Sequence, residues 1–150
     1  MLLKTLKLKN TLWAMILPYI AFRLPVSIML IRSFFVGISK EMEEAAIIDG
    51  ATLFQIYKTI YLPLSKPIMS TVIIMTAYYA WNEFVFATIF VDSSKLRTIP
   101  VGLMTFSDGL MTEWGVVLAG MVIACLPIMI LFIAMQKNFV RGMTAGSVKG

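Results

Sequence analysis

The sequence has no histidine, a single cysteine (Cys125) and charged side chains at only 14% of its 150 positions. Without histidine, a His-based catalytic triad, a metalloprotease motif and a Cys–His metal site are excluded. One cysteine forms no disulfide within the chain. The nine glycines never fall in the GxxxxGK[ST] spacing of a phosphate-binding loop. We therefore expect no enzyme that acts on its own, no metal site and no cofactor.

Hydrophobic residues, by contrast, make up 59% of the chain. Soluble domains are about 45–50% apolar and about 25% charged, and a chain of this length buries only about 68–70% of its unfolded surface. The surplus excludes an aqueous globule, and it also excludes disorder. The net charge of +5 is scattered as single cations between apolar runs, which favours membrane flanks over a nucleic-acid site. An all-α, multi-pass membrane bundle in a lipid bilayer is expected, because a lone strand would leave its peptide groups unpaired in lipid.

Three apolar stretches are long enough to cross about 30 Å of hydrocarbon, which takes about 20 helical residues. They cover residues 11–35, 67–91 and 114–135. The first carries Arg23, and the second carries Asn82 and Glu83 near its middle. A charged group in mid-membrane costs about 2.5–3.5 kcal/mol and persists where it faces other protein or a water-filled path. We expect these helices to pack around something polar.

A polar segment, residues 37–66, separates the first two spans. Ser39 is placed to cap a short helix, and Gly50 is placed to end it. Thr52 and Gln55 have capping-box spacing at the start of a second helix, which we expect Pro63 to end. The segment is therefore predicted to be a helix–turn–helix outside the bilayer, with small residues at its elbow that let another backbone approach.

Two interpretations of this segment remain open on spacing alone. An amphipathic helix between two spans often lies on the membrane interface, and the second helix carries one apolar face formed by Leu53, Ile56, Tyr57 and Ile60. Docking on another protein is the alternative. Anionic headgroups repel acidic side chains, and the first helix carries three: Glu41, Glu43 and Glu44. The acidic, small-residue elbow therefore fits docking better than lipid contact.

The distribution of cations predicts the orientation. An odd number of spans puts the polar segment and the C-terminal tail on one side of the membrane. The cations on that side are Arg32, Lys40, Lys58, Lys66, Lys137, Arg141 and Lys149. Those on the other side are Lys4, Lys7, Lys9, Lys95 and Arg97. The excess weakly favours a cytoplasmic polar segment, and three lysines before the first span suggest that further spans precede it in a longer protein.

The polar segment also carries a known pattern. Its residues run Glu44-Ala45-Ala46, then Gly50 after three residues, then Ile60-Tyr61-Leu62-Pro63 after nine more. This run resembles the EAA loop of ABC importer permeases. Further runs resemble the carbohydrate-uptake, maltose-permease-type branch of that family, and together they cover the chain from about Leu12 onward. These runs are Leu17–Tyr19, Arg32–Phe35, Trp81–Phe84 and Phe139–Gly146.

The resemblance implies a membrane-spanning permease subunit of an ATP-driven sugar importer in a bacterial or archaeal cytoplasmic (inner) membrane. It implies three partners: a cytoplasmic ABC ATPase dimer that hydrolyses the ATP, a second permease subunit and an extracytoplasmic solute-binding protein. Residues 1–150 would be the C-terminal part of a single importer transmembrane domain. The loop would be the coupling helix that docks on the ATPase, and its docking residues would be Glu44, Ala45, Ala46, Asp49, Gly50 and Ala51.

The candidates for the substrate path are Tyr78, Trp81, Asn82 and Glu83, because aromatic faces beside an amide and a carboxylate suit the C–H faces and hydroxyls of a sugar. Alternatively, Asn82 and Glu83 only bond neighbouring helices. Two other functions stay open: a truncated, non-transporting remnant, and a permease for a different small solute. The role of Arg23 is also open between pairing with an acid of a partner helix and a tolerated lesion. Contact of the Thr144–Gly150 tail with the ATPase is a further expectation.

Overall fold

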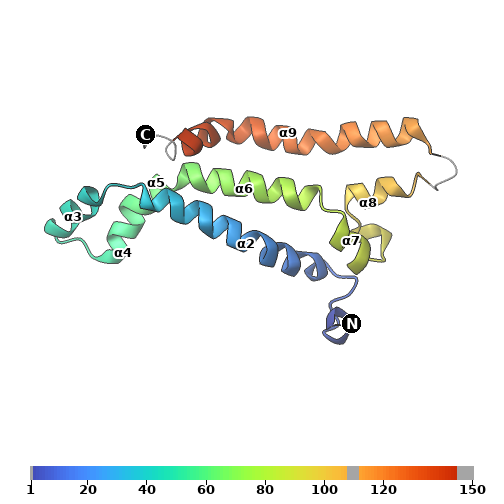
Figure 1. The fold of residues 1–150 in the computed structure, drawn as a ribbon, viewed down its shortest axis with the longest axis horizontal. Coiled ribbons are helices and arrows are strands. Elements are labelled where there is room, and N and C mark those ends of the chain that lie inside the picture. The colour runs from blue at the N-terminus through green and yellow to red at the C-terminus, as the bar shows by residue number, and fades with distance from the viewer. Residues whose placement is uncertain (1, 108–111, 145–150) are drawn as a thin grey trace. The chain divides into compact units, whose positions relative to one another are not determined.

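The computed structural model describes residues 2–107 and 112–144, with side chains described from residue 4 to residue 136 within these ranges. All its named elements are helical (Figure 1), and the extended pairing found there is an isolated bridge between Ser107 and Thr112. The elements are α1 (Leu2–Thr5), α2 (Trp13–Val36), α3 (Lys40–Ile48), α4 (Leu53–Ile56), the π-helix η1 (Tyr57–Tyr61), α5 (Leu62–Leu64), α6 (Lys66–Trp81), α7 (Val85–Phe90), the 3₁₀-helix η2 (Ser94–Leu96), α8 (Ile99–Met104) and α9 (Trp114–Thr144). The all-α prediction is confirmed.

Two helices are long and apolar enough by themselves to cross a membrane. They are α2 over Trp13–Val36 and the Trp114–Gln136 part of α9, which agree with the first and third predicted spans. Proline does not break either of them, although Pro18 and Pro25 lie in α2 and Pro127 lies in α9. Few of their side chains are buried within the chain, so most of their apolar surface is left for lipid or for other protein.

The prediction of one continuous helix over residues 67–91 is wrong. Helix α6 ends at Trp81, and the separate helix α7 starts at Val85. The Glu83 carboxylate lies at the break and accepts hydrogen bonds from the backbone N–H groups of Phe86 (2.7 Å) and Ala87 (3.0 Å) at the start of α7. The helical run Leu53–Leu64 and α6 qualify as a span only when taken together, and they are bent by 62° at Ser65.

Local signals within residues 37–66 act as predicted at four positions. Ser39 caps α3 by accepting from the Glu41 N–H, Gly50 follows the end of α3 with φ +80°, and Thr52 with Gln55 forms a capping box before α4. Pro63, however, does not end the second helix. It is the next-to-last residue of the contiguous helical run Leu53–Leu64, which extends one residue past it before the 62° bend at Ser65.

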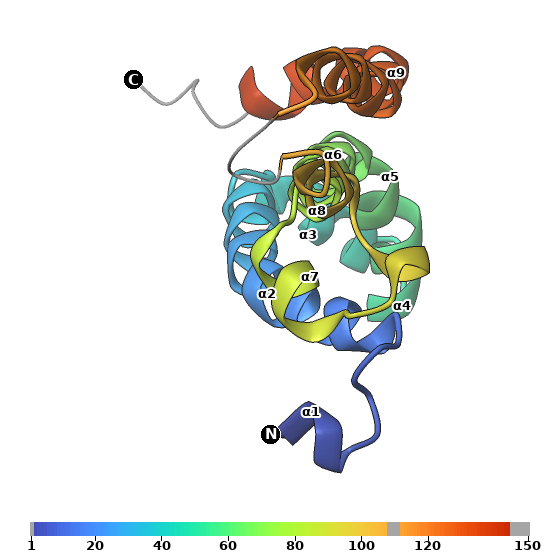
Figure 2. The same cartoon turned by 90° about the vertical axis from the view of Figure 1, so that its right-hand side faces the viewer.

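The chain forms two compact units. The first unit comprises Met1–Leu24 with Met75–Ile133, and the second unit comprises Pro25–Ile74 with Ala134–Gly150. In the first unit, a buried hydrophobic cluster connects α2, α7 and α8. Its members are Met15 of α2, Ala87 of α7, Val91 directly after α7 and Val101 of α8, and Tyr19 and Leu96 pack against it. The short helices α7 and α8 lie next to each other in both views (Figure 2). This cluster holds the segment that follows the break at Glu83.

Candidate functional site

The elbow after α3 is a Schellman turn, the hydrogen-bonded helix end that needs one left-handed residue. The Gly50 N–H donates to the Ile47 carbonyl at 2.9 Å, and the Ala51 N–H donates to the Ala46 carbonyl at 3.0 Å. Gly50 supplies the left-handed residue with φ +80°. The structure thus brings three of the six predicted coupling residues, Ala46, Gly50 and Ala51, into a single turn.

The other three predicted coupling residues, Glu44, Ala45 and Asp49, are exposed on and just after α3. Apolar side chains that the motif did not single out lie beside them in the chain. Ile48 is 85% exposed, and Phe54 on α4 is 72% exposed. An exposed apolar patch with a polar rim is typical of a surface that another molecule covers. We call this surface the elbow patch and define it as Glu44, Ala45, Asp49, Ile48, Leu53 and Phe54.

The predicted apolar face of the second helix is only partly covered in the second unit. Ile56 is buried and Ile60 half-buried, whereas Leu53 and Tyr57 are exposed. The π-helix η1 starts at Tyr57 and changes the periodicity only of the residues that follow. Leu53 is 76% exposed and belongs with the elbow patch.

Helix α3 is fixed by one contact that sequence reasoning missed. The Tyr61 hydroxyl donates a 2.6 Å hydrogen bond to the Glu43 carboxylate. The ring of Phe35, near the end of α2, packs edge-on against Tyr61 with 5.6 Å between ring centroids. Tyr61 thereby connects α3 to η1 and to the end of α2. The motif contained Tyr61 but not Glu43, and the 18-residue separation of the two left no local signal.

In the first unit, Glu83 is buried and its carboxylate has three donors. Besides the two backbone N–H groups of α7, the Tyr19 hydroxyl of α2 donates to it at 2.7 Å. The Thr98 hydroxyl also donates to the Glu83 backbone carbonyl at 2.8 Å. Glu83 thus organises the turn between α6 and α7, and this contact pattern supports the interpretation that it bonds neighbouring elements. Its role in a substrate path stays a prediction.

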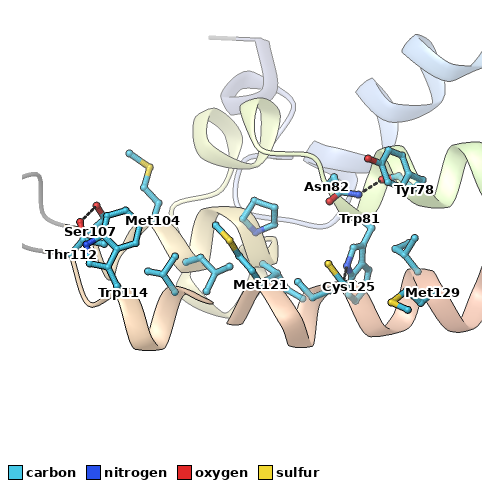
Figure 3. A pocket seen from close by; sticks show the side chains of 16 residues that line it. Tyr78, Trp81, Asn82, Met104, Ser107, Thr112, Trp114, Met121, Cys125 and Met129 are labelled. Carbon is cyan, nitrogen blue, oxygen red and sulfur yellow. Dashed lines mark hydrogen bonds between the residues drawn. The ribbon is translucent and has the colours of Figure 1, made fainter. Parts of the chain in front are cut away.

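The other three path candidates line a cavity of about 720 Å³ between α6, α8 and α9 of the first unit (Figure 3). The Trp81 indole N–H donates to the Ala124 carbonyl of α9 at 2.8 Å, and the Asn82 amide donates to the Tyr78 carbonyl at 2.9 Å. Methionines from α8 and α9 and the Cys125 side chain complete a largely apolar wall. The cavity-lining residues of α8 and α9 were not predicted, because nothing in the sequence distinguishes residues that line a cavity from residues that contact lipid.

A second cavity, of about 640 Å³, lies next to the end of α6. Tyr78 and Asn82 line both cavities, and Glu83 lines the second one. Aromatic side chains contribute much of its wall: Phe22, Tyr79, Phe84 and Phe86. Arg23 of α2 also lines it, with its guanidinium carbon 5.3 Å from the centroid of the Tyr79 ring. The structure therefore groups all four path candidates around two adjoining cavities.

A polar contact holds the start of the chain to the loop after α7. The Lys9 ammonium lies 2.7 Å from the Asp92 carboxylate, and the Asn10 side-chain oxygen accepts from the Asp92 N–H at 2.6 Å and the Ser93 N–H at 3.2 Å. The hydrogen bond from Lys9 lowers the pKa of Asp92 below its ordinary value of 3.8. Ala145–Gly150 of the tail lie outside the described residues, as do the side chains of residues 137–144, so the expected contact of the tail is not tested.

Comparison with known sequences matches residues 1–145 to the family described as "Binding-protein-dependent transport system inner membrane component". The "Probable ABC transporter permease protein YurM" of Bacillus subtilis (strain 168) is 58% identical over 149 residues, which are 99% of this chain and 50% of that protein. The "Trehalose/maltose transport system permease protein MalG" of Thermococcus litoralis is 41% identical over 143 residues, 94% of this chain and 51% of that protein. The chain spans about half the length of these curated relatives.

A solved structure is similar as well. It is titled "Crystal structure of a bacterial ABC transporter involved in the import of the acidic polysaccharide alginate". The similarity has a TM-score of 0.61 at 30% identity, and it covers 76% of this chain and 46% of that one. The helical arrangement described above is therefore one that a transporter subunit adopts.

Proposed function

Because this chain belongs to the family of binding-protein-dependent transport system inner membrane components, we propose that it is the membrane-spanning permease part of an ATP-driven importer for saccharides. The 150 residues correspond to the C-terminal half of the longer permeases, within a multi-pass protein of the bacterial or archaeal inner membrane. A separate ATPase dimer hydrolyses the ATP, a second permease subunit completes the bundle, and an extracytoplasmic binding protein delivers the solute. Relatives named for trehalose and maltose support a saccharide as the cargo.

The elbow patch is the observation that carries this proposal. A rigid Schellman turn presents exposed acidic and small residues, Glu44, Ala45 and Asp49, beside the exposed apolar side chains of Ile48 and Phe54. A groove on the ATPase would accept the small residues closely and cover the apolar ones. Closing of the ATPase dimer would then move α3, and the Tyr61–Glu43 contact would pass that movement to the neighbouring helices of the second unit.

Site-directed cross-linking tests the docking surface. In a Cys125→Ser background, Ala45→Cys places a thiol on the elbow patch of the assembled complex, and the matched control, Ser94→Cys, places one on the exposed η2. We expect a bifunctional thiol reagent to join Ala45→Cys, but not Ser94→Cys, to the ATPase. Absence of this adduct while the ATPase still co-purifies would contradict docking. Labelling of Ile48→Cys by a probe dissolved in the bilayer would instead support the membrane-interface alternative, which its 85% exposure keeps open.

The transport function is tested separately with vesicles that contain the complete native complex and its binding protein. We expect ATP-dependent accumulation of at least one radiolabelled saccharide from a panel of oligosaccharides. Accumulation of only a non-saccharide solute would support a permease for different cargo. A complex that binds no ATPase and accumulates no solute would support the non-transporting remnant.

A further inference from the structure

Arg23 is a cation in the middle of the apolar helix α2 and has no counter-ion in the described part of the chain. No ion pair joins it to a described carboxylate. Its Nε atom is buried without a hydrogen-bond partner. The contact found for its guanidinium is the face of the Tyr79 ring, 5.3 Å from the centroid. A buried polar group without a partner is costly, and more so when it is charged, so an anion that the described residues do not supply would stabilise Arg23.

Glu83 does not serve as that anion. It lines the same cavity as Arg23, but its carboxylate already accepts from Tyr19 and from the backbone N–H groups of Phe86 and Ala87. No ion pair joins Glu83 to Arg23. The Arg23 guanidinium is therefore at the wall of this cavity without an ion-pair partner among the described residues.

The rest of that cavity has the chemistry of a saccharide site. Its volume of about 640 Å³ lies within the range of small-molecule sites, roughly 300–1,000 Å³. Aromatic rings of Phe22, Tyr78 and Tyr79 offer faces for sugar C–H groups, and the Asn82 amide offers polar atoms for hydroxyls. A guanidinium adds planar, two-pronged recognition of a carboxylate, which neutral sugars do not use.

We propose that Arg23 is a specificity-determining residue that makes the path selective for saccharides carrying a carboxylate group. This proposal rests on the proposed function of saccharide import. The carboxylate of the passing solute supplies the anion that the guanidinium lacks, while the aromatic side chains and Asn82 hold the sugar rings. A neutral saccharide leaves the Arg23 charge unpaired at every passage and is carried less efficiently.

The test uses the complete native complex in vesicles and matched pairs of saccharides, each a uronic-acid-containing disaccharide and its neutral hexose counterpart. The variants are Arg23→Gln, which removes the charge, and Arg23→Lys, which keeps it. Arg32→Gln is the matched control, because Arg32 lies on the same helix and does not line this cavity. The readout is kcat/KM for each member of a pair, together with the amount of assembled complex in the membrane.

We expect the wild-type complex to carry at least one uronate disaccharide in preference to its neutral counterpart. Arg23→Gln should lower that preference by about tenfold to a hundredfold, the range for one hydrogen bond to a charged group, while Arg23→Lys retains most of it and Arg32→Gln retains all of it. An equal loss for both members of a pair, or a loss of assembled complex with unchanged preference, would overturn the proposal and assign Arg23 to packing or to an acid of a partner helix. A complex that carries only neutral saccharides would overturn it while leaving saccharide import intact. A complex that carries no saccharide would overturn the proposed function itself.

Discussion

The Tyr61 hydroxyl donates a 2.6 Å hydrogen bond to the carboxylate of Glu43. Tyr61 ends the π-helix η1, and Glu43 lies in the first turn of α3, so one contact fixes the orientation of the exposed elbow. The same Tyr61 ring packs on Phe35. A single side chain therefore joins the proposed docking helix, the π-helix and the end of α2 within the second unit.

Removing that hydroxyl should loosen α3 without disturbing the ring packing. We expect Tyr61→Phe to speed hydrogen exchange at the Ala45–Asp49 amides several-fold, because α3 loses its side-chain contact with η1. Tyr57→Phe is the control, since Tyr57 lies in the same π-helix but is exposed. Hydrogen-exchange mass spectrometry of the purified complex measures the effect. Equal exchange in Tyr61→Phe and wild type would show that the contact does not stabilise α3.

Substitution of Gly50 should act through backbone conformation and not through crowding. A Cβ at Gly50 would meet nothing within 4 Å, but its φ of +80° is unfavourable for L-residues, at roughly 1–2 kcal/mol. We expect Gly50→Ala to weaken the elbow and to reduce the amount of ATPase that co-purifies with the complex. Gly50→Asn, whose side chain tolerates left-handed backbone, should retain most of it. The prediction fails if the two variants recruit the ATPase equally well.

Glu83 should matter for folding more than its exposed neighbours do. In Glu83→Gln, one amide oxygen replaces the two carboxylate oxygens that accept from Tyr19, Phe86 and Ala87, and a buried donor is left without its acceptor. We expect a loss of stability of about 1–3 kcal/mol, measured as a lower midpoint of thermal unfolding in detergent. Glu113→Gln, an exposed acid of the same unit, should leave the midpoint nearly unchanged. Similar midpoints for both variants would contradict the role assigned to Glu83.

The Lys9–Asp92 contact should show a defined pH dependence. The hydrogen bond from Lys9 lowers the pKa of Asp92 below its ordinary value of 3.8, so ionised Asp92 favours the folded state. Its contribution is present above about pH 4 and is lost as the pH falls through the lowered pKa. We expect the thermal midpoint of wild type to exceed that of Asp92→Asn slightly from pH 5 to 8 at low salt, and the difference to shrink as the pH falls below 3.8 and to vanish below the lowered pKa. A difference that grows on acidification would contradict the contact.

The predictable parts of the fold were those set by local chemistry. Ser39, Gly50 and the Thr52–Gln55 box each act on backbone groups within a few residues, and each does in the structure what its residue type favours. The membrane spans in α2 and α9 could also be predicted, because a span is recognised from the length of its apolar run alone. The docking role of the elbow residues and the path role of Tyr78, Trp81 and Asn82 stay predictions.

Other features depended on contacts between residues far apart in the chain. The break after Trp81 is invisible in hydropathy, and the Glu83 side chain at the break accepts from Tyr19 of another helix, 64 residues away. The Trp81 bond to Ala124 spans 43 residues. Pro63 was misjudged by one residue, because the helical run extends to Leu64 before it bends at Ser65.

The π-helix η1 also changes the direction in which side chains before and after it point, relative to one another, around the axis of the helical run. Ile56 before η1 and Ser65 after it are both buried, although they lie nine positions apart. In an uninterrupted α-helix, nine steps make about two and a half turns and put such a pair on opposite sides. The wider turn of η1 takes up one extra residue, about 100° of rotation, and so reduces the angle between the two side chains to about 80°. Deleting one residue from Tyr57–Tyr61 would restore ordinary α-helical winding. It would rotate the elbow about the helix axis by more than a quarter turn, although every residue of the elbow would be unchanged.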